Sequence, residues 1–132
     1  MQQSGKGQIL YDKIIYSVVD HLKQEGFSSV RANCKGFTLP NQVKWDEEDE
    51  GVVPDITGEY GGSLYLFDVQ TGDELDVESA RDRWRLLSVH AKRYRGKFYL
   101  VVPEPEVQQL QQLIEDLDVR PGVLKLRGIE DA

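Results

Sequence analysis

The chain has 132 residues, which suits one domain that can bury a hydrophobic core without disulfides or structural metals. Hydrophobic residues make up 39% of it and charged residues 30%, which excludes wholesale disorder. A single cysteine, Cys34, excludes an internal disulfide, and the two histidines lie in no metal-spaced Cys/His cluster, which argues against zinc. No apolar run reaches the length of a membrane span or a signal-peptide core, so we expect a cytoplasmic protein with no membrane partner.

The formal net charge of −7 argues on its own against a nucleic-acid partner. The charges are unevenly distributed, however. Residues 46–50 are all acidic, whereas residues 81–97 carry many arginines and lysines against the single acid Asp82. Because binding depends on the local field rather than on the total charge, the acidic balance does not exclude DNA.

The first half of the chain predicts a helix followed by strands. Apolar residues recur at helical spacing over residues 9–25, and Gly26 marks the end of this helix. Residues 28–34 favour a short strand, and residues 35–50 a loop or hairpin tip that includes the acidic run. Two further strands are predicted at 51–57 and 63–71, separated by a turn at residues 59–62.

The second half predicts a helix over residues 77–95 with two distinct stripes. The apolar stripe, expected to face the core, contains Ala80, Trp84, Leu87, Ala91 and Tyr94. A neighbouring stripe contains Arg81, Arg85, Ser88, Lys92 and Arg95. A strand at 97–103, a helix at 105–117 and a last strand at 123–126 complete the order α-β-β-β-α-β-α-β. We therefore expect an α/β fold, a mixed β-sheet flanked by helices in a single domain over residues 1–132.

Two acids on neighbouring predicted strands form a candidate site. Alternation in the strand 63–71 places Asp68 and Gln70 on one face, and Asp55 lies on the preceding predicted strand, after Pro54. Two nearby carboxylates repel each other unless a proton or a cation lies between them. Magnesium takes such oxygen ligands, so the pair suits metal-assisted phosphodiester hydrolysis. The alternatives are that Asp55 is a turn acid and that Asp68 lies at a solvated strand end.

The segments Pro54-Asp55 and Asp68-Val69-Gln70 resemble the signature of the PD-(D/E)XK nucleases. The order of elements over roughly residues 8–103 is also similar to that family, and in particular to its archaeal Holliday-junction resolvase branch. The resemblance implies a restriction-endonuclease-like fold and a Mg²⁺- or Mn²⁺-dependent endonuclease that hydrolyses DNA. It also implies a possible homodimer, because resolvase-like members act as dimers.

The resemblance further assigns roles to individual residues. Asp55 and Asp68 would bind the metal, together with the backbone carbonyl of Val69. Gln70 stands where the family usually has a lysine; it can donate a hydrogen bond to the attacking water but brings no cation. The family often adds an acid from the first helix, and Asp12 fits better than Asp20, because Asp12 borders the apolar stripe whereas Asp20 points away from it.

Phosphate contacts are expected from the basic stripe of the helix 77–95, namely from Arg81, Arg85, Lys92 and Arg95; the alternative is that this face is merely solvated. A rival to the nuclease is a catalytically inactive nuclease-fold module that binds nucleic acid or a protein partner. The sequence feature that distinguishes these two hypotheses is Gln70, because an amide in place of the usual lysine weakens the case for a nuclease. A third, an unrelated α/β protein with incidental acids, is separated from both by the pairing of Asp55 with Asp68.

Overall fold

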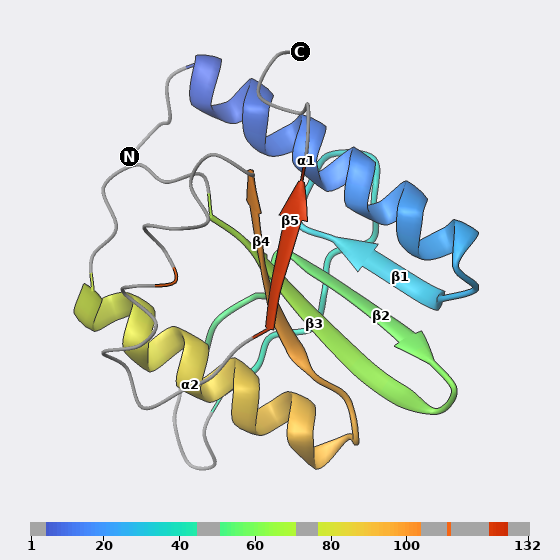
Figure 1. The fold of residues 1–132 in the computed structure, drawn as a ribbon, viewed down its shortest axis with the longest axis vertical. Coiled ribbons are helices and arrows are strands. Elements are labelled where there is room, and N and C mark those ends of the chain that lie inside the picture. The colour runs from blue at the N-terminus through green and yellow to red at the C-terminus, as the bar shows by residue number, and fades with distance from the viewer. Residues whose placement is uncertain (1–4, 45–50, 71–76, 104–110, 112–121, 127–132) are drawn as a thin grey trace.

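The computed structural model describes residues 5–44, 51–70, 77–103, 111 and 122–126, which form two helices and a five-stranded sheet (Figure 1). The elements in chain order are α1 (Gly5–Gln24), β1 (Ser28–Ala32), β2 (Ile56–Tyr60), β3 (Ser63–Val69), α2 (Val77–Arg93), β4 (Phe98–Pro103) and β5 (Gly122–Leu126). None of the helices in these residues is both long and apolar enough to span a membrane.

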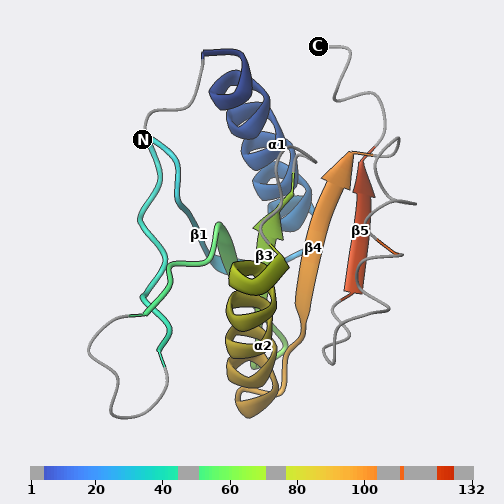
Figure 2. The ribbon, with the colours of Figure 1, turned by 90° about the vertical axis from the view of Figure 1, so that its left-hand side faces the viewer.

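The sheet is mixed, with the spatial order β1-β2-β3-β4-β5. β2 pairs antiparallel with β1 and with β3, whereas β4 pairs parallel with β3 and with β5. In Figure 2, β4 and β5 lie side by side at the edge away from β1. The α/β class and the predicted order are confirmed through β4, and the last predicted strand is present as β5. The helix predicted over residues 105–117 lies outside the described residues.

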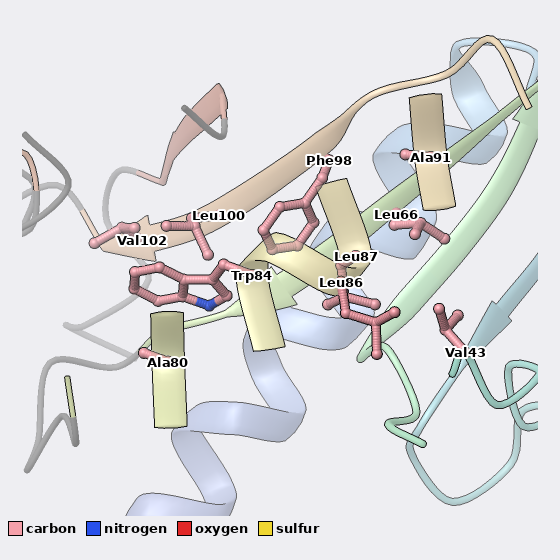
Figure 3. Close-up of a cluster of buried hydrophobic side chains, with 10 residues drawn as sticks. All are labelled: Val43, Leu66, Ala80, Trp84, Leu86, Leu87, Ala91, Phe98, Leu100 and Val102. Atoms are coloured by element: carbon pink, nitrogen blue, oxygen red, sulfur yellow. The ribbon is translucent and has the colours of Figure 1, made fainter. Parts of the chain in front are cut away.

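The two helices lie on opposite faces of the sheet, and each covers one hydrophobic cluster (Figure 1). Side chains of a strand alternate between its two faces, so neighbouring residues of β3 join different clusters. Leu66 packs with α2, whereas Phe67 packs with α1. Figure 3 shows the α2 cluster, in which Trp84 lies beside Leu100 and Phe98. Trp84 is therefore a core residue, as predicted.

The predictions for Tyr94 and for the end of the second helix were wrong. α2 ends at Arg93, and the ring of Tyr94 is 53% exposed instead of buried. The cause is the close approach of the following residues to β3. A Cβ atom on Gly96 would lie 1.5 Å from the carbonyl oxygen of Leu64, and the amide of Leu64 donates a hydrogen bond to the carbonyl of Tyr94 (3.2 Å). The chain must leave the helix earlier to make this approach.

The second predicted strand is also shifted, because β2 covers Ile56–Tyr60 rather than residues 51–57. Gly61 and Gly62 both have positive φ angles, 59° and 83°, so the turn is a two-residue hairpin that extends β2 to Tyr60. The pairing of Ile56 with Phe67 then places Asp55, just before β2, opposite the end of β3.

Candidate functional site

Asp55 and Asp68 meet where β2 begins and β3 ends, in the interior of the sheet. The backbone amide of Asp55 donates a hydrogen bond to Oδ1 of Asp68 (3.2 Å). In return, the amide of Val69 donates to Oδ2 of Asp55 (2.7 Å). The antiparallel pairing of β2 with β3 thus brings together the two acids that the sequence suggested as a pair.

Asp68 is held by an arginine from α2. This carboxylate is only 4% exposed, and Arg83 donates to both of its oxygens, from Nε to Oδ2 and from Nη2 to Oδ1, the latter at 3.0 Å. Nη2 also donates to the carbonyl of Val53 (2.7 Å). A buried carboxylate requires such a partner, and a two-point contact with a guanidinium also fixes its orientation. Burial lowers the pKa of Arg83, but bonding to Asp68 outweighs this effect and raises that pKa above its ordinary value.

Asp55 is held from the other face of the sheet by α1. The hydroxyl of Tyr11 donates to Oδ1 of Asp55 (2.7 Å) and also lies 3.3 Å from the carbonyl oxygen of Asn33. The amide of Asn33 donates to the backbone carbonyl of Asp55 (2.8 Å). Both the side chain and the backbone of Asp55 are therefore fixed by segments distant in the sequence.

The charges of the site are unbalanced. Burial, followed by repulsion from Asp68, raises the pKa of Asp55 to about 7, although Val69, Tyr11 and Arg83 each favour the charged form. Burial and the neighbouring Asp55 raise the pKa of Tyr11 above its ordinary value, so its hydroxyl stays protonated and remains a donor. Among the described residues, Arg83 donates to Asp68, whereas Asp55 accepts from the uncharged Tyr11 hydroxyl and Val69 amide, so a negative charge on Asp55 calls for a proton or another cation.

The oxygen atoms of this pair are of the chemical type that magnesium and manganese take as ligands. Oδ1 of Asp68 accepts two hydrogen bonds, from the amide of Asp55 and from Arg83, whereas Oδ2 of Asp68 and both oxygens of Asp55 accept one each and retain a further lone pair. Protein-bound Mg²⁺ commonly has one or two carboxylate ligands and completes its shell with water and phosphate oxygens. Within the described ranges, no group of three or more Asp, Glu, His or Cys side chains is placed to hold a metal. The pair therefore offers two carboxylates, with Arg83 bound to one of them.

The other two side chains suggested for the site, those of Gln70 and Asp12, belong to residues that hydrogen-bond to groups outside the pair. Gln70 follows β3 directly, is half-buried, and donates its backbone amide to the carbonyl of Val101 (2.9 Å). The carboxylate of Asp12 accepts a contact from the thiol of Cys34 (3.5 Å). Of the two neighbouring residues Tyr11 and Asp12, Tyr11 is the one that contacts Asp55.

Sequence reasoning missed both Arg83 and Tyr11 as members of the site. A signal for Arg83 was present, because it lies three positions after Ala80 and four before Leu87, within the apolar stripe of α2. An arginine on the inward face of a helix needs a buried acid as its partner. Tyr11 carried no comparable signal, since a tyrosine beside an apolar stripe is ordinary core composition.

The four residues expected to contact phosphates are all exposed, but they are spread along the molecule. Arg81 and Arg85 lie two positions before and after Arg83 on α2, so their side chains leave the helix on a different side from that of Arg83. Lys92 and Arg95 lie near the other end of β3, where the carbonyl of Tyr94 meets Leu64. Arg95 follows α2 and has a φ of 64°, so helical periodicity does not place it on the same face as the other three.

Comparison with known proteins gives no family. No protein-family model matches the sequence, and no curated protein matches it significantly. One solved structure that resembles the chain is the crystal structure of a protein of unknown function, AF1548, with a TM-score of 0.49 and 12% sequence identity. The match covers 89% of this chain and 58% of that protein, so the chain spans less than two thirds of it. A likeness of this extent identifies neither a family nor an activity.

Proposed function

We propose that the chain is a divalent-metal-dependent nuclease of the PD-(D/E)XK type that hydrolyses DNA phosphodiester bonds. The supporting observation is the joined pair of Asp55 and Asp68, in which Asp55 is half-buried, Asp68 is buried, and Arg83 binds Asp68. A divalent cation would neutralise the negative charge of such a pair, in which burial and then repulsion from Asp68 raise the pKa of Asp55 to about 7.

Asp55 and Asp68 would hold the metal, with the carbonyl of Val69 as the backbone ligand that the family resemblance implies. A bound Mg²⁺ or Mn²⁺ would activate water and stabilise the charge that develops on the phosphorus centre. The protein's own groups orient the ligands: Arg83 fixes Asp68, while Tyr11 and the amide of Val69 fix Asp55. Gln70 would donate a hydrogen bond that positions the attacking water.

DNA would be bound by the exposed cations of α2 and of the residues that follow it. Arg81 and Arg85 would contact phosphates along the exposed side of α2. Lys92 and Arg95 would contact phosphates farther along the molecule. Such contacts release counterions, so the affinity for duplex DNA should fall with salt by a log–log slope of about 0.9 per phosphate contacted.

A second candidate is a catalytically inactive nuclease-fold module that binds nucleic acid or a protein. The two-point contact of Arg83 with Asp68 favours it, because a guanidinium already neutralises one of the two acids. Gln70 favours it as well, since an amide brings no positive charge to a developing phosphate anion. In this case Arg83 would be the permanent counter-ion of the pair.

Cleavage assays with matched variants separate the two candidates. Duplex, junction and single-stranded DNA are incubated with the protein in Mg²⁺ and, separately, in Mn²⁺. We expect cleavage by the wild type, and its loss in Asp55→Asn and in Asp68→Asn, because a neutral amide cannot balance the metal. Asp20→Asn is the control, since Asp20 is an exposed acid of α1 bonded to Gln24. A wild type that cleaves none of the three substrates with either metal would contradict the nuclease and favour the inactive module.

A further inference from the structure

An exposed aromatic ring stands at the point where the chain leaves α2. The backbone of Tyr94 is held on both sides: its amide donates to the carbonyl of Ala91 (3.1 Å), and its carbonyl accepts from the amide of Leu64 (3.2 Å). Its ring contacts that of His90, with a centroid distance of 4.9 Å and an interplanar angle of 51°. The residue is nevertheless 53% exposed. The fold thus presents a large aromatic surface to solvent from a fixed position.

Cations flank this ring in the sequence. Residues 90–97 read HAKRYRGK and contain no acid, and Lys92, Arg95 and Lys97 are exposed. The ammonium group of Lys97 lies 5.4 Å from the centroid of the Tyr99 ring, which packs with the α1 cluster rather than beside Tyr94. The segment that carries Tyr94 is therefore locally basic in sequence, although the whole chain is acidic.

A fixed, exposed aromatic ring among cations matches the chemistry of single-stranded nucleic acid. Bases of a duplex already stack on each other, whereas an unpaired base offers a free π-face that a tyrosine can cover. The flanking phosphates then lie within reach of lysine and arginine. We propose that Tyr94 is a stacking platform for an unpaired base of single-stranded DNA, with Lys92 and Arg95 contacting the adjacent phosphates.

This inference rests on the DNA partner of the proposed function, and it adds the form of DNA that is recognised. It does not depend on metal or on cleavage, because Tyr94 lies about 16 Å from Arg83, eleven residues away at ~1.5 Å per residue. Binding at Tyr94 and chemistry at the acid pair can therefore be measured separately.

The direct test is binding of a labelled ten-nucleotide thymidine oligomer by fluorescence anisotropy, at low salt and in EDTA. Tyr94→Ala is expected to weaken binding by about 5- to 100-fold, the range found for loss of one stacked base. Tyr94→Phe should bind within about twofold of the wild type, because the ring is kept. The matched control is Tyr16→Ala: Tyr16 lies on α1, on the other side of the sheet, and is 52% exposed. That variant should bind like the wild type.

A change of ligand tests the same contact in the wild-type protein, so misfolding of a variant cannot account for the result. An abasic oligomer carries the same phosphates but offers no base to stack, so the wild type should bind it more weakly than the thymidine oligomer. Tyr94→Ala should bind the two oligomers equally. Lys92→Gln should lower the salt slope by about 0.7, the value per phosphate contact in single strands. Lys23→Gln, on an exposed residue of α1, should leave the slope unchanged.

Three results would overturn the inference. The first is equal affinity of the wild type for the thymidine and abasic oligomers, which would leave only a charge interaction. The second is equal loss of binding in Tyr16→Ala and Tyr94→Ala. The third is binding of polyglutamate as tight as binding of DNA, which would indicate an acidic protein partner instead. A wild type that shows no metal-dependent cleavage but binds DNA through Tyr94 would contradict only the proposal of a nuclease. It would support this inference.

Discussion

Arg83 donates hydrogen bonds to both carboxylate oxygens of Asp68, and this contact ties α2 to the central strand β3. Asp68 in turn accepts the backbone amide of Asp55. One guanidinium therefore organises a site that contains two acids. Because this contact both stabilises the fold and neutralises one acid, it links the stability of the protein to the chemistry proposed for it.

Arg83→Met should destabilise the protein by about 3 kcal/mol, because it leaves the carboxylate of Asp68 buried without its partner. Equilibrium unfolding in urea measures this loss. The matched control is Arg81→Met, an exposed arginine two positions earlier in α2, which should change the free energy of unfolding by less than about 0.5 kcal/mol. Equal stability of the two variants would show that the contact with Asp68 contributes nothing to the fold.

The pKa of Asp55 makes the stability of the protein depend on pH. It is about 7 in the folded chain, against an ordinary 3.8 that applies when the chain unfolds. Between these values the folded state binds more protons than the unfolded state, so the contribution of Asp55 to stability falls as pH rises from about 4 to about 7 and is constant above that.

Urea unfolding at pH 5, 6, 7 and 8 checks the direction in which the free energy of unfolding changes with pH. Asp55→Asn should lose stability less steeply than the wild type over that range, because an amide does not titrate. Asp20→Asn should keep the wild-type profile. A wild type and an Asp55→Asn variant with parallel profiles would place the pKa of Asp55 near its ordinary value and contradict the imbalance of charge at the site.

Gly96 is required by the close passage of the chain beside β3, where a Cβ atom would lie 1.5 Å from the carbonyl oxygen of Leu64. Because that neighbour is backbone, it cannot move aside as a flexible side chain would. Gly96→Ala should therefore destabilise the protein by more than about 3 kcal/mol, and it should lower the melting temperature measured by circular dichroism. A melting temperature within a degree or two of the wild type would contradict this account of how α2 ends.

Gln70→Lys tests whether the site lacks a cation for catalysis. If the protein is a nuclease, the added ammonium group lies beside the acid pair and stabilises the anionic transition state, so the cleavage rate should be kept or raised. Initial rates on the DNA substrate that the wild type cleaves best provide the measurement. A rate reduced by tenfold or more would show that the amide of Gln70 has a role that a lysine cannot fill.

Local patterns in the sequence predicted most of the fold, because they follow from side-chain periodicity. The alternation in β3 correctly assigned Leu66 to one face and Phe67 to the other. The position of Tyr94 was not predictable, because helical periodicity alone continued the apolar stripe through it. What ends α2 is the approach of Gly96 to Leu64, a contact between residues far apart in the sequence.

The candidate site was predictable only in part, for a similar reason. Strand spacing and the family resemblance pointed to Asp55 and Asp68, and the hairpin brings the two together. The partners of these acids come from the two helices on opposite faces of the sheet, Tyr11 from α1 and Arg83 from α2. Which helical residue reaches a strand end depends on how the helices pack, and periodicity does not encode that.

The most direct test of the central claim, that Asp55 and Asp68 form a divalent-cation site, is isothermal titration of Mn²⁺ into the wild type and into Asp55→Asn. Near pH 7 the wild type should bind Mn²⁺ and release a proton, because the pKa of Asp55 lies at that pH and the metal requires the carboxylate. The proton release appears as a binding heat that varies with the ionisation enthalpy of the buffer. Asp55→Asn should bind Mn²⁺ at least tenfold more weakly and release no proton. No binding by the wild type, or equal binding by both proteins, would contradict the claim.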